Sequence, residues 1–286
     1  MKTGMNLLLW TPAAGEEHLK VIEDIKNWGF DGVEFPMFDP DGSPWSTLSS
    51  ALDDLGLGRT ACTIMPEGGN IVGESAAERE AGVEHLKRCI DRLAELGGEI
   101  LAGPLHSPCG RLVGRGYNDD EWKWCAEGLR AAGEHAQPAG IVLALEALNR
   151  FETYMINCQA DLSRMTDDIG LENVGQMYDT FHANIEEKDI AEAIRTGGTR
   201  IREVHISAND RATPGEDHID YAATFAALKE IGYDGWLTIE SFGKALPEVA
   251  AATCIWRSMA PSEEHVCREG LKMIQSLWSV GSERKE

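Results

Sequence analysis

Apolar runs alternate with amphipathic stretches along the whole of this 286-residue chain. The short apolar, β-branched runs predict strands, and the longer stretches carry apolar residues at three- and four-residue spacing, which predicts helices. In Glu16–Trp28, for example, Leu19, Ile22, Ile25 and Trp28 fall on one face. The predicted strands are Met5–Trp10, Gly32–Met37, Arg59–Met65, Ile100–Leu105, Ile141–Glu146, Val174–Asp179, Ile201–Ile206 and Trp236–Glu240.

Glycine marks the end of several predicted helices. Gly29, Gly56, Gly97 and Gly232 each stand shortly before a predicted strand, and glycine tolerates the left-handed conformation that closes a helix. The other helices expected between strands are Ala77–Leu96, Asn118–Ala136, Gln159–Ile169, Asp189–Thr196 and Asp220–Ile231. Eight strand–helix alternations without a domain-sized linker predict a single α/β domain, a (β/α)8 or TIM barrel. A doubly wound open sheet is the alternative, but no G-x-G-x-x-G follows the first strand.

The chain continues past the eighth predicted strand for longer than one helix requires. The single domain is expected to span residues 1–286, with an extension from about residue 245 that includes Ile255–Arg257 and a final helix over Glu263–Trp278. This extension is expected to cap the barrel or to meet a second subunit. A homodimer or homotetramer is therefore the expected assembly.

Composition and charge narrow the class of protein. Hydrophobic residues make up 43% and charged residues 26%, and the net charge is -22. Such an acidic surface repels phosphate backbones and anionic headgroups, so nucleic acid and membrane are not expected partners. No signal peptide is apparent at the first residues, and no apolar stretch approaches the roughly 18 residues of a membrane span. The seven scattered cysteines favour reduced thiols and a cytoplasmic location.

Acidic residues and one histidine follow each other at the ends of the last four predicted strands. Glu146, Asp179 and Glu240 end their strands, and His205 lies near the end of the seventh. In a barrel of this type, the carboxyl ends of the strands meet at one mouth, where active sites lie. Carboxylates that close together require a cation. The oxygen-rich set with one imidazole suits Mn²⁺, Mg²⁺ or Co²⁺.

Four segments of the chain resemble one known family. Leu145–Glu152, Asp179–Glu187, His205–Arg211 and Ile239–Phe242 are similar to the motifs at strands five to eight of the D-tagatose and D-psicose 3-epimerases, within the xylose-isomerase-like barrels. The resemblance covers nearly the full chain, and the combination is specific although each motif alone is weak. It implies a metal-dependent ketose 3-epimerase whose substrates are free sugars in pairs such as D-fructose/D-psicose, D-tagatose/D-sorbose and L-ribulose/L-xylulose.

The resemblance also implies a role for individual residues. It makes Glu146 and Glu240 the acid–base pair that removes and returns the C3 proton on opposite faces of the sugar. It assigns four ligands to a divalent metal: Glu146, Asp179, His205 and Glu240. It gives substrate contacts to Glu152, His182 and Arg211, with pocket-wall contacts from Cys62, Leu105 and Phe242.

The sequence departs from the family pattern at the loop after the first strand. Family members often carry an aromatic residue there, over the sugar, whereas this loop is Thr11–Gly15 without one. The lid is therefore expected to be smaller or to come from elsewhere. The loop His106–Gly116 after the fourth strand is rich in glycine and arginine, and it is either part of such a lid or an ordinary flexible loop.

Three other functions are weighed against epimerisation. An aldose–ketose isomerase of the same superfamily, acting on hydroxypyruvate or a sugar, would use a similar metal and glutamate set, but Glu152 and Arg211 favour the epimerase. An endonuclease-IV-like phosphodiesterase needs more histidines and a basic face, which the charge of -22 opposes. A non-catalytic sugar-binding barrel is disfavoured because Glu146 and Glu240 are both present.

Overall fold

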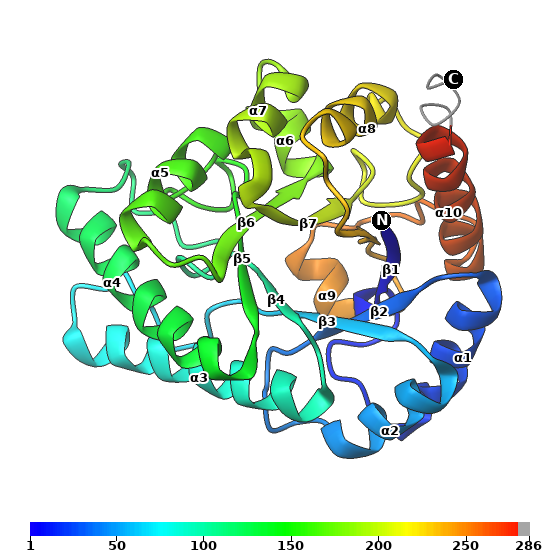
Figure 1. Ribbon diagram of the computed structural model, residues 1–286, viewed down its shortest axis with the longest axis horizontal. Coiled ribbons are helices and arrows are strands. Elements are labelled where there is room, and N and C mark those ends of the chain that lie inside the picture. Colours follow the sequence, from blue (N-terminus) through cyan, green and yellow to red (C-terminus); the bar gives the residue numbers. More distant parts are fainter. Residues whose placement is uncertain (280–286) are drawn as a thin grey trace.

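Eight parallel strands close into a barrel in the computed structural model, which describes residues 1–279 (Figure 1). The strands pair in sequence order, and β1 closes the barrel by pairing with β8, with Met5 opposite Ile239. The predicted single-domain TIM barrel is thus confirmed. The strands are β1 Lys2–Asn6, β2 Gly32–Pro36, β3 Gly58–Cys62, β4 Ile100–Gly103, β5 Val142–Glu146, β6 Val174–Asp179, β7 Ile201–Ile206 and β8 Trp236–Ile239.

Helices surround the barrel (Figure 1), and apolar residues of most of them belong to its buried core. The predicted helix stops are seen at Gly29 and Gly56, whose φ angles of 104° and 62° require the left-handed conformation. Within residues 1–279, no helix is both long enough and apolar enough to cross a membrane. The helices are α1 Leu19–Trp28, α2 Trp45–Leu55, α3 Ala76–Leu96, α4 Asp119–Ala136, α5 Gln159–Ile169, α6 Thr180–Glu186, α7 Ile190–Gly197, α8 Tyr221–Glu230, α9 Pro247–Ala252 and α10 Glu263–Ser279.

The first strand differs most from its prediction. It runs over Lys2–Asn6 instead of Met5–Trp10, and Leu7–Leu9 form a 3₁₀ turn. The Asn6 side chain causes this change, because its Oδ1 accepts a hydrogen bond from the backbone N–H of Leu8 at 2.7 Å. An apolar run alone does not separate a buried strand from a buried turn.

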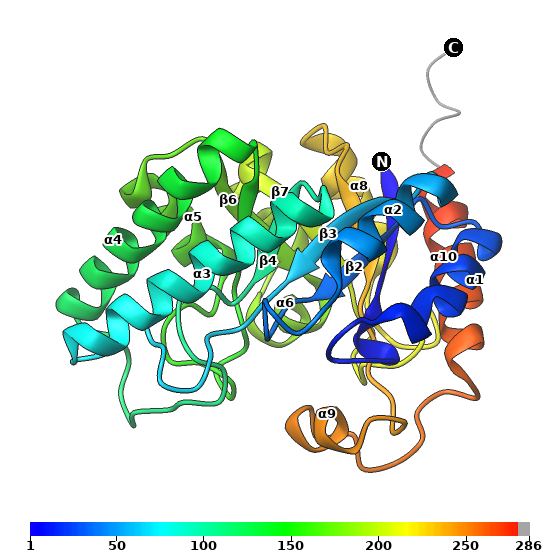
Figure 2. The same cartoon turned by 90° about the horizontal axis from the view of Figure 1, so that it is seen from below.

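Two short helices were not expected from the hydrophobic pattern, and both lie near the carboxyl ends of the strands. In α6, the Asp179 side chain caps the helix by accepting from the Phe181 N–H at 2.6 Å. Figure 2 shows α9 on the side of the barrel opposite the N-terminus, beyond the ends of the strands. The final helix α10 packs beside α1, α8 and β8. Whether this extension caps the barrel or also meets a second subunit stays a prediction.

Candidate active site

The ends of β5 to β8 bring the four predicted ligands together. Glu146 ends β5, Asp179 ends β6, His205 is the last residue but one of β7, and Glu240 directly follows β8. Each is at most 8% exposed. Potential ligand atoms of Asp179, His205 and Glu240 all lie within 4.8 Å of one another, and the same holds for Glu146, Asp179 and His182. The two groups share Asp179, so one buried cluster contains all four ligands.

The end of β5 is held in place by its neighbour β4. After β4 the chain turns inward, and His106 Nε2 donates to the backbone carbonyl of Glu146 at 2.8 Å. Its other nitrogen, Nδ1, lies 2.9 Å from the hydroxyl of Ser107. Burial lowers the pKa of His106 to about 4, so the ring is neutral. Its hydrogen bond to Glu146 therefore fixes the backbone at the end of β5.

Arg211 places a positive charge inside the carboxylate cluster. Its Nη1 donates to Asp179 Oδ2 at 3.1 Å and to Glu240 Oε2 at 2.8 Å. The guanidinium also lies 3.8 Å from the ring centroid of Phe181. The backbone of Arg211 has a φ of 63°, a left-handed conformation that is uncommon outside glycine. Its N–H donates to the Ala208 carbonyl at 2.9 Å, which fixes this turn. Strain of this kind gathers at functional sites.

The three carboxylates have very different affinities for a proton. Burial, together with the nearby Asp179 and Glu240, raises the pKa of Glu146 well above its ordinary value. Burial also raises the pKa of Asp179, although the charge of Arg211 opposes this. Burial acts in the same direction on Glu240, but His205 and Arg211 outweigh it and lower the pKa of Glu240 to about 2. One carboxylate that holds a proton and another that releases it are the elements of an acid–base pair.

His182 and Glu152 lie on the same side of the cavity as Glu146. The backbone N–H of Asn149 donates to His182 Nδ1 at 3.0 Å, and Nη2 of Arg211, which can only donate, lies 2.9 Å from His182 Nε2. That Nε2 lies 3.5 Å from Glu146 Oε1. Burial and the charge of Arg211 lower the pKa of His182 well below its ordinary value, so the ring is neutral. Asn149 Nδ2 donates to Glu152 Oε1 at 2.7 Å, which orients this carboxylate as well.

A cavity of about 460 Å³ opens above the cluster. Of the predicted wall residues, Cys62 and Phe242 line it, whereas Leu105 does not. Leu105 is fully buried in the core, because β4 ends at Gly103 and the Leu105 N–H bonds back to the Gly103 carbonyl at 2.8 Å. The charged and polar lining comes from β5 to β8 and the segments that follow them. Part of the apolar lining comes from the first half of the barrel and from α9, namely Leu8, Phe38, Ile64, Val249 and Ala252, and the rest follows β5, β6 and β8, namely Leu148, Phe151, Phe181, Ile185 and Phe242.

The cover of the cavity comes from segments that the hydrophobic pattern does not single out. The loop Thr11–Gly15 contributes nothing to the lining, and Cys109 is the one lining residue from the loop His106–Gly116. Residues at α9 and just after it line the cavity instead, including Val249 and Cys254. The expectation that the cover comes from elsewhere than the first loop agrees with this arrangement.

Two acidic residues beneath the cluster were missed by the sequence analysis. Glu34 on β2 and Glu203 on β7 are both fully buried inside the barrel. Glu34 Oε2 lies 2.9 Å from His205 Nε2, and Glu203 Oε1 accepts from the Thr238 hydroxyl at 3.0 Å. Burial disfavours a charged imidazole, but the Glu34 and Glu240 carboxylates outweigh it and raise the pKa of His205 well above its ordinary value. An acidic residue in the middle of an apolar strand was the signal available in the sequence.

The residues present fit a divalent cation. Three buried carboxylates and an imidazole are the donor set that Mn²⁺, Mg²⁺ and Co²⁺ share. The position of Arg211 Nη1 between Asp179 and Glu240 shows that the cluster accommodates positive charge there. His205 supplies a second observation, because neither ring nitrogen has a partner in hydrogen-bonding geometry although the ring is 1% exposed.

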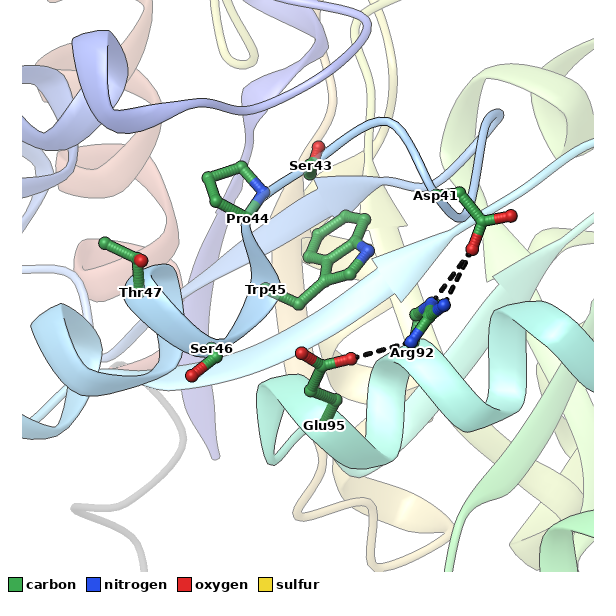
Figure 3. Close-up of a pocket in the computed structure, with 8 residues that line it drawn as sticks. All are labelled: Asp41, Ser43, Pro44, Trp45, Ser46, Thr47, Arg92 and Glu95. Carbon is green, nitrogen blue, oxygen red and sulfur yellow. Dashed lines mark hydrogen bonds and ion pairs between the residues drawn. The ribbon is translucent and has the colours of Figure 1, made fainter.

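A second hollow, of about 200 Å³, lies on the outer surface between the β2–α2 loop and α3 (Figure 3). Arg92 dominates it, with Nη2 2.8 Å from Asp41 and Nη1 2.9 Å from Glu95. The indole N–H of Trp45 donates to the Pro40 carbonyl at 2.6 Å. Arg92 and the Trp45 indole are satisfied by these contacts, and the described residues of the lining form no group of converging carboxylates and histidines like the cluster at the barrel mouth.

Comparisons with known proteins agree with this geometry. Residues 22–277 match the family described as "Xylose isomerase-like TIM barrel". A "Probable ketose 3-epimerase" of Synechocystis sp. is 31% identical over 98% of both chains, and an "L-ribulose 3-epimerase" of Mesorhizobium japonicum is 33% identical over 90% of this chain and 88% of its own. A solved L-ribulose 3-epimerase structure superimposes with a TM-score of 0.92 at 31% identity, covering 100% of this chain and 99% of the other.

Proposed function

The chain belongs to the xylose isomerase-like TIM barrel family, and from that membership we propose that it is a metal-dependent ketose 3-epimerase. The substrates are free ketohexoses and ketopentoses, and the reaction inverts C3 by removing and returning a proton. Relatives that carry the name ketose 3-epimerase or L-ribulose 3-epimerase align along nearly the whole chain, which supports this assignment. An enzyme of this kind is an isomerase.

The single observation that carries the proposal is the pair Glu146 and Glu240 at one cavity. They come from β5 and from the end of β8, and both line the cavity. A sugar held between them presents its C3 to two carboxylates, so that one oxygen takes the proton and the other carboxyl group returns one from the opposite face. The inversion needs no redox cofactor, because no electrons leave the substrate.

The neighbouring donors hold the carbonyl end of the sugar. His182 and Arg211 line the same end of the cavity, with Arg211 Nη2 2.9 Å from His182 Nε2. The Arg211 guanidinium, held there beside His182, is placed to stabilise negative charge on the substrate O2 as the C3 proton leaves. Glu152, oriented by Asn149, is placed to accept a hydrogen bond from a sugar hydroxyl.

A divalent cation belongs to the same proposal, held by Glu146, Asp179, His205 and Glu240. When bound, it supplies positive charge that stabilises the enediolate form of the substrate. Mn²⁺, Mg²⁺ and Co²⁺ suit these ligands. We also propose a homodimer or homotetramer and a cytoplasmic location for the enzyme.

Deuterium incorporation tests the function directly. The purified enzyme with Mn²⁺ is incubated with D-fructose, D-tagatose and L-ribulose in D₂O, and the products are separated and examined by NMR. Epimerisation places deuterium at C3 of a new ketose, because a different carboxyl group returns the proton. An aldose product labelled at C2, with label at C1 of the recovered ketose, would instead identify an aldose–ketose isomerase, and unchanged sugars would refute both.

A further inference from the structure

We propose that Glu34 is a positioning residue that fixes the His205 ring so that Nδ1 faces the metal ligands. This inference rests on the proposed metal site and deepens it. Glu34 lies on β2, which β1 and β8 separate from β7, the strand that carries His205. The two side chains are 0% and 1% exposed, so water does not compete for their contact.

The two nitrogens of the His205 ring face two different carboxylates. Nε2 lies 2.9 Å from Glu34 Oε2, and Nδ1 lies 3.5 Å from Glu240 Oε1. The ligand atoms of Asp179 and Glu240 are within 4.8 Å of the ring. Nε2 therefore points down to Glu34, and Nδ1 points to the site where a cation would be held.

Glu34 is itself held in place from one side only. Asn6 Nδ2 donates to the same Oε2 at 2.5 Å, and Asn6 Oδ1 is occupied by the Leu8 N–H. The second oxygen, Oε1, is buried without a hydrogen-bond partner. A buried carboxylate with an unsatisfied oxygen is costly for folding, and a buried ion pair adds little stability in return. Because Glu34 is costly to bury, its contact with the His205 ring indicates a functional role.

The chemical consequence concerns which nitrogen can bind a metal. The Glu34 carboxylate lies 2.9 Å from Nε2, and its negative charge favours the ring hydrogen on that nitrogen, which leaves the Nδ1 lone pair for a cation. Loss of such a partner typically weakens metal binding by about 10–100-fold. Glu34 thus makes His205 a ligand through one defined atom, although it touches neither the sugar nor the metal.

Glu34→Gln tests this assignment, with Glu121→Gln as its matched control. Both replacements are nearly isosteric and both carboxylates are buried, but Glu121 bonds to Arg115, Asn118 and Tyr154 instead of His205. Mn²⁺ affinity is measured by titration calorimetry without sugar, and the visible spectrum of bound Co²⁺ reports the ligand set. Glu34→Gln is expected to bind Mn²⁺ about 10–100-fold more weakly and to change the Co²⁺ spectrum. The control is expected to match the wild type in both.

Three outcomes overturn the assignment: equal Mn²⁺ affinity in Glu34→Gln and wild type, an equal loss in the control, or no Mn²⁺ binding by the wild type. Circular dichroism and melting of the metal-free variants check folding. If Glu34→Gln does not fold, Glu34→Asp keeps the charge but withdraws it from the ring, and the same comparison applies. Because no sugar is present, the result is independent of the epimerase assay: weak metal binding by Glu34→Gln supports the assignment even if no ketose is converted.

Discussion

Arg211→Met removes the guanidinium that lies between Asp179 and Glu240 while it keeps most of the aliphatic volume. Nη1 lies 3.1 and 2.8 Å from these two carboxylates, and the arginine is only 8% exposed. Removing one partner of such a buried pair typically costs about 3–5 kcal/mol. At about 2.1 cal/mol/K per residue, unfolding a chain of this length has an entropy near 0.6 kcal/mol/K. The metal-free variant is therefore expected to melt about 5–8 °C below the metal-free wild type.

Added metal should remove much of this difference in melting temperature, because a divalent cation held by the same carboxylates replaces the lost charge. At a hundredfold excess over Kd, a ligand stabilises the folded wild type by about 2.7 kcal/mol, or about 4–5 °C here. The rise on adding Mn²⁺ is expected to be larger for Arg211→Met, since the ion also relieves the uncompensated carboxylates. Scanning calorimetry of both proteins, with and without Mn²⁺, gives the four melting temperatures of this cycle.

The matched control is Arg200→Met, which removes an arginine paired with Asp167 on the surface. The Arg200 side chain is 38% exposed, and surface pairs contribute about 0–1 kcal/mol. This variant should melt within about 2 °C of the wild type and respond to Mn²⁺ as the wild type does. Equal melting of metal-free Arg211→Met and wild type, or identical Mn²⁺ shifts in both, would refute the view of Arg211 as the compensating cation.

Three further predictions concern the metal and the proton. Stripping with a chelator should abolish turnover, and Mn²⁺, Co²⁺ or Mg²⁺ should restore it; full activity in a sample verified as metal-free would contradict the ligand assignment. Glu240→Gln keeps an oxygen ligand but loses the base, so kcat should fall by about 10²–10⁴-fold while sugar binding remains measurable; near-normal turnover would exclude Glu240 as base. The pKa values of Glu146 and His205 are raised without metal, so Mn²⁺ binding should release protons and become tighter as pH rises. Calorimetry in buffers of different ionisation enthalpy measures the released protons. An apparent binding enthalpy that is the same in all buffers would contradict this prediction.

The sequence was most informative where local pattern and position coincide. Glu146, Asp179 and Glu240 each follow an apolar run at the end of a predicted strand, and in a barrel such ends face one mouth. The order of elements alone therefore brings them together. Leu105 is less well defined by its pattern, because the chain continues past the last strand residue, Gly103, and buries Leu105 away from the lining of the cavity. An apolar residue in the sequence predicts a buried side chain, but it does not predict whether that side chain lies in the core or lines a cavity.

Contacts across the barrel could not be predicted in this way. Glu34 and His205 are separated by most of the chain and meet only when the barrel closes. The left-handed backbone of Arg211 was equally hidden, because arginine carries no preference for it and the turn depends on bonds to Ala208 and Phe242. The helix α9 was not predicted, because its six residues are too few to reveal an amphipathic pattern.

The charged groups of the cavity and part of its apolar lining come from different parts of the barrel. The proton-transferring and charged groups come from β5 to β8, whereas Phe38, Ile64 and Val249 come from the β2 and β3 ends and from α9. These apolar side chains form no hydrogen bonds with the carboxylates, so exchanging them reshapes the space for the far end of a substrate and leaves the acid–base pair undisturbed. Substitutions confined to these three positions can therefore change which sugars are accepted while the proton-transferring groups stay intact.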